Sequence, residues 1–555
     1  MPATKRRRDQ GSSSNDHVVG NGRISNVNDQ KTALAGPVVF WFRKDLRTTD
    51  NRGLHRAWEL AVQGRKQQKT AAGTRPLAGN LLTIYVVCGS QWHAHDLAAC
   101  KVDLMLRSVR SVQSTLESPN CNIPVTVLHA DSMQSVPDVV AAYCRRVGAS
   151  ALVVNAEYEV DERRRDEHVE RDLNAVRFVV EHDECVIPPG LVTTKDGSRC
   201  PVVYSPFRRA WEARVTAEND QWTRLVPAPE PNPPAIRSLA PELFGSKVPD
   251  PTAVDQPLPG FERAFDPAVL AHTRAAYPTG EIAAMQRVRT FASHAIKSYS
   301  VDRDFPALEN GTASVSAYLN VGAVSIRQCL AAARDANHDK IGAGDPGCVH
   351  WIQELVWRDF YRHIMVAFPR VSMNLPFKPE TTRIAWTEGE QAQRYFTAWK
   401  TGRTGYPLVD AGMRQLVATG FLSNRVRMVV AMFLTKDLLI NWQWGERFFM
   451  HHQVDGDLAS NNGGWQWAAS TGTDSQPYFR VFNPMLQASR FDPDGTYIRQ
   501  WVPELRNVTS NAAVHEPFAK LSTAQFMRTG YPQPIVDHKV ARERAIAAFK
   551  AASAL

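Results

Sequence analysis

Short apolar runs alternate with helical patterns through the first third of the chain. Five runs of four to seven mainly apolar residues have the length of buried strands. Between them, apolar residues recur at helical spacing, for example over residues 103–116 and 136–147. Strands that alternate with helices form parallel sheets between helical layers, so the pattern predicts a doubly wound parallel α/β domain over residues 37–190. The expected strands are Val38–Phe42, Leu81–Val87, Val125–Leu128, Ala151–Val154 and Val176–Val180.

The pattern changes twice after this domain. Residues 226–260 are rich in proline, which at this density excludes a helix or a central strand. We therefore expect residues 191–279 to connect two domains. Beyond them helical periodicity dominates, which predicts an all-helical domain over residues 280–520 and a helical extension over residues 521–555.

Charge distinguishes the N-terminal tail from the rest of the chain. Residues 1–36 hold few apolar side chains, so we expect a disordered tail, with six basic and three acidic residues. The full chain has a net charge of +9, so the remainder is also basic, which weakly favours an anionic partner such as DNA. Lys5–Arg8 fits either a nuclear localisation signal or an ordinary solvated tail. Asp9 and Asp16 interrupt the pattern of a mitochondrial transit peptide, so we expect the nucleus, with the mitochondrion left open.

The eight cysteines are scattered and form no C-x-x-C pair. Such a distribution is typical of reduced thiols in an intracellular protein, and we expect neither disulfides nor a metal site. No apolar stretch reaches membrane-spanning length and no signal peptide opens the chain, so no membrane partner is expected.

The most unusual segment is residues 455–467, which contains two carboxylates, two asparagines, two adjacent glycines and two tryptophans. If this segment is helical, Asp457, Asn461 and Trp465 share one face. Gly463 and Gly464 would weaken such a helix, so their expected use is the close approach of something flat.

A second segment places two indoles, a carboxylate, a guanidinium and a phenol on one side of a predicted helix. These residues are Trp351, Glu354, Trp357, Arg358 and Tyr361. An amphipathic helix with core aromatics is the alternative. Leu355, Val356 and Phe360 already supply an apolar face, which favours a functional role for the first set.

These segments, with Ala468–Asp474 and Pro477–Pro484, closely resemble the flavin-binding core of the DNA photolyase and cryptochrome family. The resemblance spans roughly residues 37–520, and it implies FAD, active as FADH⁻, in the helical domain. It also implies that Arg427 pairs with Asp455 and that Asn461 faces flavin N5. The implied FAD-binding residues are Tyr299, Thr312, Ala313, Ser314, Val315, Ser316, Trp351, Arg427, Asp455, Gly456, Asp457 and Asn461.

The same resemblance implies DNA that contains a pyrimidine dimer as the substrate. Trp357 is implied to stack on the flipped bases, which need a π-face to replace lost stacking. Glu354 is implied to hydrogen-bond the pyrimidine carbonyls, and burial would favour the protonated carboxyl group that this role needs. The implied catalytic residues are Glu354, Trp357, Asn461 and Met428. The implied DNA-binding residues are Arg303, Glu354, Trp357, Arg358, Asn424, Arg425 and Gln487.

Electron supply and light capture have their own implied residues. Trp386, Trp442 and Trp465 match the chain that carries electrons to the flavin, with core packing as the alternative for each alone. Asp161 and Glu162 stand where folate-type members hold a pterin with an Asn-Glu pair. We expect an antenna pigment at this position, with folate (5,10-methenyltetrahydrofolate) favoured over a deazaflavin.

Within the family, the residues favour a class I cyclobutane pyrimidine dimer photolyase. Six-four photolyases carry a histidine pair where this chain has Ser423-Asn424-Arg425. Plant cryptochromes usually carry aspartate and animal cryptochromes cysteine at the position of Asn461. We therefore expect a monomer that repairs UV-damaged double- or single-stranded DNA. A cryptochrome-type blue-light photoreceptor is the alternative, and a non-photoactive flavoprotein is a third possibility that the three tryptophans disfavour.

Overall fold

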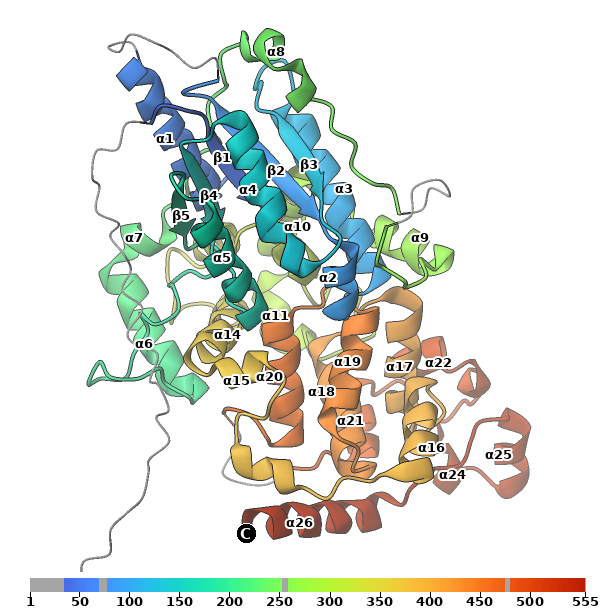
Figure 1. The fold of residues 1–555 in the computed structure, drawn as a ribbon. Coiled ribbons are helices and arrows are strands. Elements are labelled where there is room, and N and C mark those ends of the chain that lie inside the picture. The colour runs from blue at the N-terminus through green and yellow to red at the C-terminus, as the bar shows by residue number, and fades with distance from the viewer. Residues whose placement is uncertain (1–33, 69–76, 252–257, 475–479, 555) are drawn as a thin grey trace, which may run out of the picture. The chain divides into compact units, whose positions relative to one another are not determined.

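A five-stranded parallel sheet forms the N-terminal domain of this computed structural model, which describes residues 34–68, 77–251, 258–474 and 480–554. The strand order is β3-β2-β1-β4-β5, and every neighbouring pair is parallel (Figure 1). The strands are β1 (Val38–Phe42), β2 (Leu81–Val87), β3 (Val125–His129), β4 (Ala151–Asn155) and β5 (Arg177–Glu181). The predicted α/β domain is confirmed, with strand ends displaced by at most one residue. The expected signal Lys5–Arg8 lies outside the described residues.

Helices cover both faces of the sheet. They are α1 (Arg52–Gln68), α2 (Gly89–Ala94), α3 (Ala99–Leu116), η1 (Met133–Ser135), α4 (Val136–Val147) and α5 (Val160–Asp172). Successive side chains of a strand point to opposite faces. Phe40 and Phe42 of β1 therefore pack with α1 and α3, whereas Val39 and Trp41 pack with α4 and α5. The doubly wound arrangement follows from this alternation.

The segment expected to connect the domains contains helices, and the expectation that proline excludes any helix from residues 226–260 is wrong, because α8 (Ile236–Leu239) and η2 (Pro241–Leu243) lie there. The other described helices of this segment are α6 (Tyr204–Ala217), α7 (Asn219–Thr223) and α9 (Pro267–Ala276). Helix α6 buries Tyr204, Phe207 and Trp211 at helical spacing. Proline shortens the helices between residues 226 and 260 but does not affect α6, which lies before them.

In the described part of the C-terminal domain all regular elements are helices, as predicted, and the last of them belongs to it. Helix α26 covers Ile384 and Leu439 with Ala545 and Phe549, so the expected extension is packed against the domain. The helices are α10 (Glu281–His294), η3 (Ile296–Ser298), α11 (Tyr299–Asp302), α12 (Ser316–Val321), α13 (Ile326–Ala336), α14 (Pro346–Ala367), α15 (Pro369–Ser372), η4 (Pro379–Arg383), α16 (Gly389–Lys400), α17 (Pro407–Thr419), α18 (Asn424–Met432), η5 (Phe433–Asp437), α19 (Trp442–His452), α20 (Leu458–Ala469), α21 (Pro484–Phe491), α22 (Thr496–Trp501), η6 (Pro503–Leu505), α23 (Asn511–His515), α24 (Pro517–Lys520), α25 (Thr523–Thr529) and α26 (His538–Ala554).

Among the described residues, no single helix is long and apolar enough to cross a membrane. One sharply bent pair, α17 with the stretch Asn424–Asp437, passes the same test of length and composition. Most residues of this pair are buried inside the helical domain.

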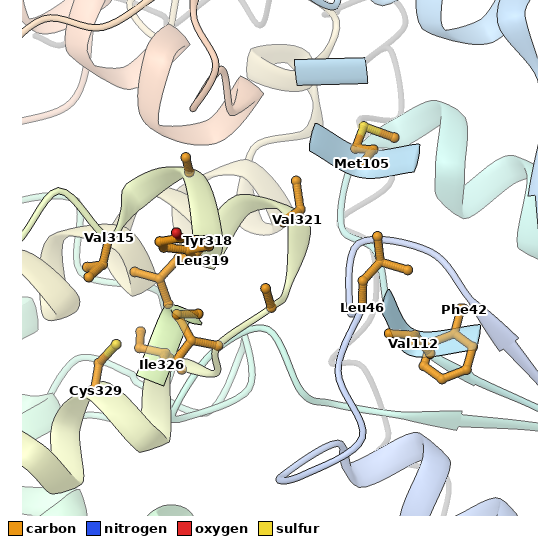
Figure 2. Packing of buried hydrophobic residues seen from close by; sticks show 14 of the residues in the cluster. Phe42, Leu46, Met105, Val112, Val315, Tyr318, Leu319, Val321, Ile326 and Cys329 are labelled. Carbon is orange, nitrogen blue, oxygen red and sulfur yellow. The ribbon is translucent and has the colours of Figure 1, made fainter. Parts of the chain in front are cut away.

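A shared hydrophobic cluster and buried ion pairs join the sheet domain to the helical domain. Figure 2 shows part of the cluster, in which Phe42 and Met105 come from the sheet domain and Tyr318 and Leu319 from the helical domain. The fully buried Arg327 of α13 contacts Asp50 at 3.0 Å and Asp183 at 2.5 Å, and both carboxylates follow strands of the sheet domain. Buried charges are tolerated only when they are paired and hydrogen-bonded, so this contact holds the two domains in one arrangement.

Candidate functional site

A cavity of about 710 Å³ lies within the helical domain and collects most of the residues that the sequence singled out. Its size is within the range of small-molecule and cofactor sites. Helices α14, α18 and α20 contribute its main walls, and the segment before α12 closes one side.

Helix α14 forms the first wall. Asp345 caps the helix through the N–H groups of Gly347 and Cys348, and Pro346 occupies the first turn, where its missing N–H costs nothing. The five polar and aromatic residues predicted to share one face all line the cavity, so that prediction is confirmed. These residues are Trp351, Glu354, Trp357, Arg358 and Tyr361.

Helix α20 (Leu458–Ala469) forms the opposite wall and is capped by Asp457, whose side chain accepts a bond from Ser460 N at 3.0 Å. Asn461 and Trp465 line the cavity from the same face, as the spacing predicted. A Cβ atom on Gly463 would lie 2.2 Å from the Tyr361 ring, so this glycine admits the flat group that the sequence led us to expect. A Cβ atom on Gly464 would meet nothing within 4 Å, because Gly464 borders the cavity itself.

The two aspartates at the start of α20 are held by arginines. Arg427 donates to both oxygens of Asp455 at 2.9 and 2.8 Å, which confirms the predicted pair, and Ser316 Oγ donates to Asp455 at 2.7 Å. Asp457 lies 3.0 Å from Arg362. Burial disfavours the charge of Asp457, but the nearby guanidinium groups, Arg362 foremost, outweigh it and hold its pKa well below the usual range. The sequence analysis missed Arg362, whose only signal is its position one turn after Arg358.

Asn461 is fixed by a main-chain contact, because its Nδ2 donates to the carbonyl oxygen of Glu446 at 2.9 Å. That contact leaves the neutral amide at the cavity wall, where Asn461 is a lining residue. Burial raises the pKa of the adjacent Glu446 carboxyl group to about 7.

The segment implied to hold the FAD phosphates also lines the cavity. It comprises Thr312, Ala313, Ser314, Val315 and Ser316, with Tyr299 beside it. Thr312 is not a helix cap, because α12 begins at Ser316 after Val315. Ser314 adopts a left-handed conformation with φ 47°, and the hydroxyl groups of Thr312 and Ser314 lie 3.2 Å apart. The hydroxyls therefore face a ligand site without serving a helix terminus.

Three implied roles are not supported by the geometry. Gly456 is not among the residues that line the cavity, and its carbonyl oxygen accepts bonds from Lys101 and Asn320. Arg358 is 14% exposed and donates to the main-chain and side-chain oxygens of Glu184, so it braces the domain contact instead of reaching outward to phosphate.

Glu354 is the third difference, because its side chain is 32% exposed and lies 2.5 Å from Arg303. Burial alone would lower the pKa of Arg303, but the Glu354 charge outweighs burial and raises it above the ordinary value. The expected role needed a buried carboxyl group, whereas Glu354 is partly exposed and paired with a cation.

The rim of the cavity holds the remaining residues implied to contact DNA. Asn424, Arg425 and Met428 line it from α18, and Arg425 is paired with Asp304 at 2.7 Å. Gln487 lies in an adjoining cavity of about 300 Å³ that Arg425 and Met428 also line. The structure therefore brings these residues together at one mouth.

The tryptophans implied in electron transfer lie in or against one hydrophobic cluster. Trp465 and Trp442 are buried, and Trp386 is half-buried with its ring centroid 5.8 Å from that of Phe549 in α26. Trp399, which the sequence analysis did not assign, lies 6.1 Å from Trp465 between ring centroids. Only its aromatic character could have suggested it.

The two antenna residues lie apart from the main cavity, both near His95, but differ in exposure. Asp161 is exposed at the start of α5, whereas Glu162 is buried 3.3 Å from His95. Burial raises the pKa of Glu162, but the His95 contact and the charge of Lys44 outweigh it and lower the pKa to about 2. Only Asp161 is therefore presented at the surface.

The sequence analysis also missed Tyr204, which does not line the cavity but packs against the cavity residue Trp357. Its ring stacks on Trp357 with centroids 3.6 Å apart and planes 5° apart. The signal was the helical spacing of Tyr204, Phe207 and Trp211 inside the segment that we expected to be a connector.

Comparison with known proteins finds a match to the same family in both domains. Residues 38–232 match the family model described as DNA photolyase, and residues 351–551 match the model described as FAD binding domain of DNA photolyase. A deoxyribodipyrimidine photo-lyase from Neurospora crassa is 40% identical over 528 residues, which cover 92% of this chain and 81% of that protein.

Two solved structures resemble the whole fold. A class III photolyase from Agrobacterium tumefaciens has a TM-score of 0.74 at 29% identity and covers 96% of this chain and 100% of its own. A cryptochrome from Synechocystis sp. PCC6803 has a TM-score of 0.73 at 26% identity, and the match covers 94% of this chain and 99% of the cryptochrome chain.

Proposed function

This chain belongs to the DNA photolyase family, and we propose from this premise that it is a deoxyribodipyrimidine photo-lyase, which uses light to repair cyclobutane pyrimidine dimers in DNA. The observation that carries the proposal is the cavity of about 710 Å³ between α14 and α20. Its walls combine the Asp455–Arg427 pair, the neutral amide of Asn461 and the face of Trp357.

The residues of the cavity fit FAD. The volume of about 710 Å³ and the open space at Gly464 leave room for a flat ring system between the two helices. Asp455, Asp457 and Asn461 supply polar groups at one wall, and Tyr299 with Thr312–Ser316 would hold the phosphates. FAD in its reduced form would supply the excited electron that splits the dimer.

The protein's own contribution is position, shielding and charge. Trp357 offers a π-face for the flipped bases, and Met428 and Asn424 border the same mouth. The Arg303–Glu354 pair lies at this mouth, where Arg303 would place a positive charge near the DNA backbone. The buried aromatic residues around Trp465 exclude water from the flavin side of the cavity.

The test is affinity for damaged against undamaged DNA. We expect the purified protein to bind an oligonucleotide with one thymine dimer at least roughly a thousandfold more tightly than the undamaged sequence, within the usual range for specific DNA recognition. Equal affinities for the two oligonucleotides would contradict the proposal.

A cryptochrome-type photoreceptor is the second candidate, favoured by the structural likeness to the Synechocystis protein. Asn461 and the higher identity to a photo-lyase favour repair. Light-dependent repair by the purified protein separates the two functions.

Replacement of Trp465 by phenylalanine is expected to block light-driven reduction of oxidised flavin, because phenylalanine is not oxidisable at accessible potentials. Repair by chemically reduced protein should persist, since its electron starts on the flavin. The measurement is the loss of oxidised-flavin absorbance under illumination with an external reductant.

Trp442→Phe should give the same result, and Trp399→Phe serves as the matched control because its ring contacts Trp465 without belonging to the expected chain. Normal photoreduction in Trp465→Phe and Trp442→Phe, or its loss in Trp399→Phe alone, would show that electrons follow another route.

We further propose a folate antenna at the edge formed by α2 and α5. In open parallel sheets, flavin-type ligands bind beyond the carboxyl ends of the strands, where the strand order reverses. Here that crevice, between β1 and β4, has a volume of only about 30 Å³. Ion pairs of Arg43, which follows β1, with Glu157 and Asp166, which follow β4, cross it. A deazaflavin would have to displace these pairs, which favours a pigment at the outer edge.

Glu162→Ala is expected to release the folate, because it removes the buried carboxylate that holds His95 at 3.3 Å and so loosens the edge. Repair should then fall in the near ultraviolet and persist where flavin absorbs. Glu170→Ala, at an exposed acidic residue of the same helix α5, is the matched control for loss of charge alone. Pigment extraction that yields a deazaflavin, or flavin alone, from the wild-type protein would contradict the folate proposal.

A nuclear location is also part of the proposal, supported by the basic run Lys5–Arg8. Deletion of residues 1–36 is expected to leave repair in vitro intact and to move a fluorescent fusion from the nucleus to the cytoplasm of a eukaryotic host. Replacement of the four residues of the run by alanine should have the same effect. A truncated fusion that still concentrates in the nucleus would place the signal elsewhere.

A further inference from the structure

The short segment Val202–Tyr204 links the two walls of the cavity near Trp357. Asp474, which follows α20 and lines the cavity, donates its N–H to the Val202 carbonyl oxygen at 3.2 Å. In return, the N–H of Tyr204 donates to the Asp474 carboxylate at 3.0 Å. The hydroxyl group of Thr473 also donates to Val202 O. The first residue of α6 is thereby fixed to the end of the α20 wall.

Tyr204 is equally fixed to the α14 wall. Its hydroxyl group donates to the carbonyl oxygen of Gln353 at 2.9 Å, one turn before Trp357. The stacked geometry, with centroids 3.6 Å apart and planes 5° apart, covers one face of the Trp357 indole. Tyr204 itself is 8% exposed, so neither its ring nor its hydroxyl group is free to move away.

Among the described residues, no ring other than Tyr204 stacks in parallel on Trp357. Phe360 meets the indole at 79° with centroids 5.5 Å apart, and Tyr361 lies tilted at 5.6 Å. Trp357 is half-buried and lines the cavity. With one face against Tyr204, the part that remains accessible is the opposite face, whose plane Tyr204 determines.

We propose that Tyr204 is a positioning residue for dimer recognition: it stacks on the buried face of Trp357 and holds the indole so that the free face receives the damaged bases. This inference rests on the proposed function. A large side chain that is held in place before binding loses less conformational freedom when it binds, so the stack favours association. Aromatic pairs of this kind also contribute beyond the area they bury.

Two classes of variant separate stacking from the hydrogen bond. Tyr204→Phe keeps the ring and removes the bond to Gln353, whereas Tyr204→Leu and Tyr204→Met remove the ring. We expect the leucine and methionine variants to raise the dissociation constant for a dimer-containing oligonucleotide by roughly 3- to 10-fold. Tyr204→Phe should stay within about twofold. Under repair conditions, KM for the dimer should rise while kcat and the absorbance of bound flavin stay unchanged.

Tyr406→Leu is the matched control, because Tyr406 is a buried tyrosine that donates to a main-chain carbonyl, Val536 O at 2.8 Å, away from the cavity. It should lower stability without changing the ratio of affinities for damaged and undamaged DNA. Wild-type affinity for the dimer in both Tyr204→Leu and Tyr204→Met would overturn the inference. A loss of affinity in Tyr204→Phe as large as in these two variants would also overturn it. Wild-type protein that does not distinguish dimers would instead overturn the proposed function.

Discussion

Gly464→Leu is expected to raise the dissociation constant for FAD by roughly 10- to 100-fold, because the new side chain would fill space that the ring system needs. Gly464 lies inside α20, and a Cβ atom there would meet nothing within 4 Å. Leucine is also a better helix former than glycine by about 0.8 kcal/mol, so the empty protein should not lose stability. The measurement is FAD affinity on reconstitution of the apoprotein, together with its Tm.

Gly463→Ala is the matched control for this prediction. A Cβ atom at Gly463 would lie 2.2 Å from the Tyr361 ring, so this smaller change should lower the Tm by crowding two helices. If Gly464→Leu binds FAD as tightly as the wild type, the flavin does not lie against α20.

Trp357→Ala is expected to weaken binding of a dimer-containing oligonucleotide by roughly 5- to 150-fold, the range found when an aromatic side chain that stacks on one base is removed. Bound flavin should be retained, because Trp357 lies at the mouth beside Tyr204 and not against the Asp455–Arg427 pair. The measurement is the dissociation constant for dimer-containing DNA, with flavin absorbance recorded in parallel.

Trp357→Phe keeps a smaller π-face, so its dissociation constant for dimer-containing DNA should lie between those of Trp357→Ala and the wild type. Affinity for undamaged DNA, which depends mainly on phosphate contacts, should change little in either variant. Unchanged affinity of Trp357→Ala for the dimer would contradict the assignment of this mouth as the dimer site.

Spacing along the chain was enough to predict the two walls of the site. The residues of α14 and α20 recur every three or four positions, and a helix has only one way to place them. The sheet was predictable for the same reason, since apolar runs that alternate with helices leave few arrangements. The Asp455–Arg427 pair came from the family resemblance, because 28 residues separate its members and no local pattern joins them.

The misplaced residues share one property, which is a partner that is distant in the sequence. The sequence alone suggests that Arg358 is a surface cation, but the contact between the two domains places Glu184 beside it. The sequence alone suggests that Glu354 is a buried acid, but the structure places Arg303 2.5 Å from it. Tyr204 was hidden because the prolines that follow α6 made the whole segment look like a linker. Tertiary contacts of this kind change a side chain's role without leaving a periodic signal.

Light-dependent conversion of a thymine dimer by the purified, chemically reduced protein tests the central claim most directly. An oligonucleotide with one dimer is mixed with a small amount of protein under anaerobic conditions and is illuminated at wavelengths that reduced flavin absorbs. The account predicts intact thymines in excess of the protein present, no conversion in the dark, and less conversion with Gly464→Leu than with the wild type when no FAD is added. Bound flavin and tight dimer binding without any light-dependent conversion would contradict it.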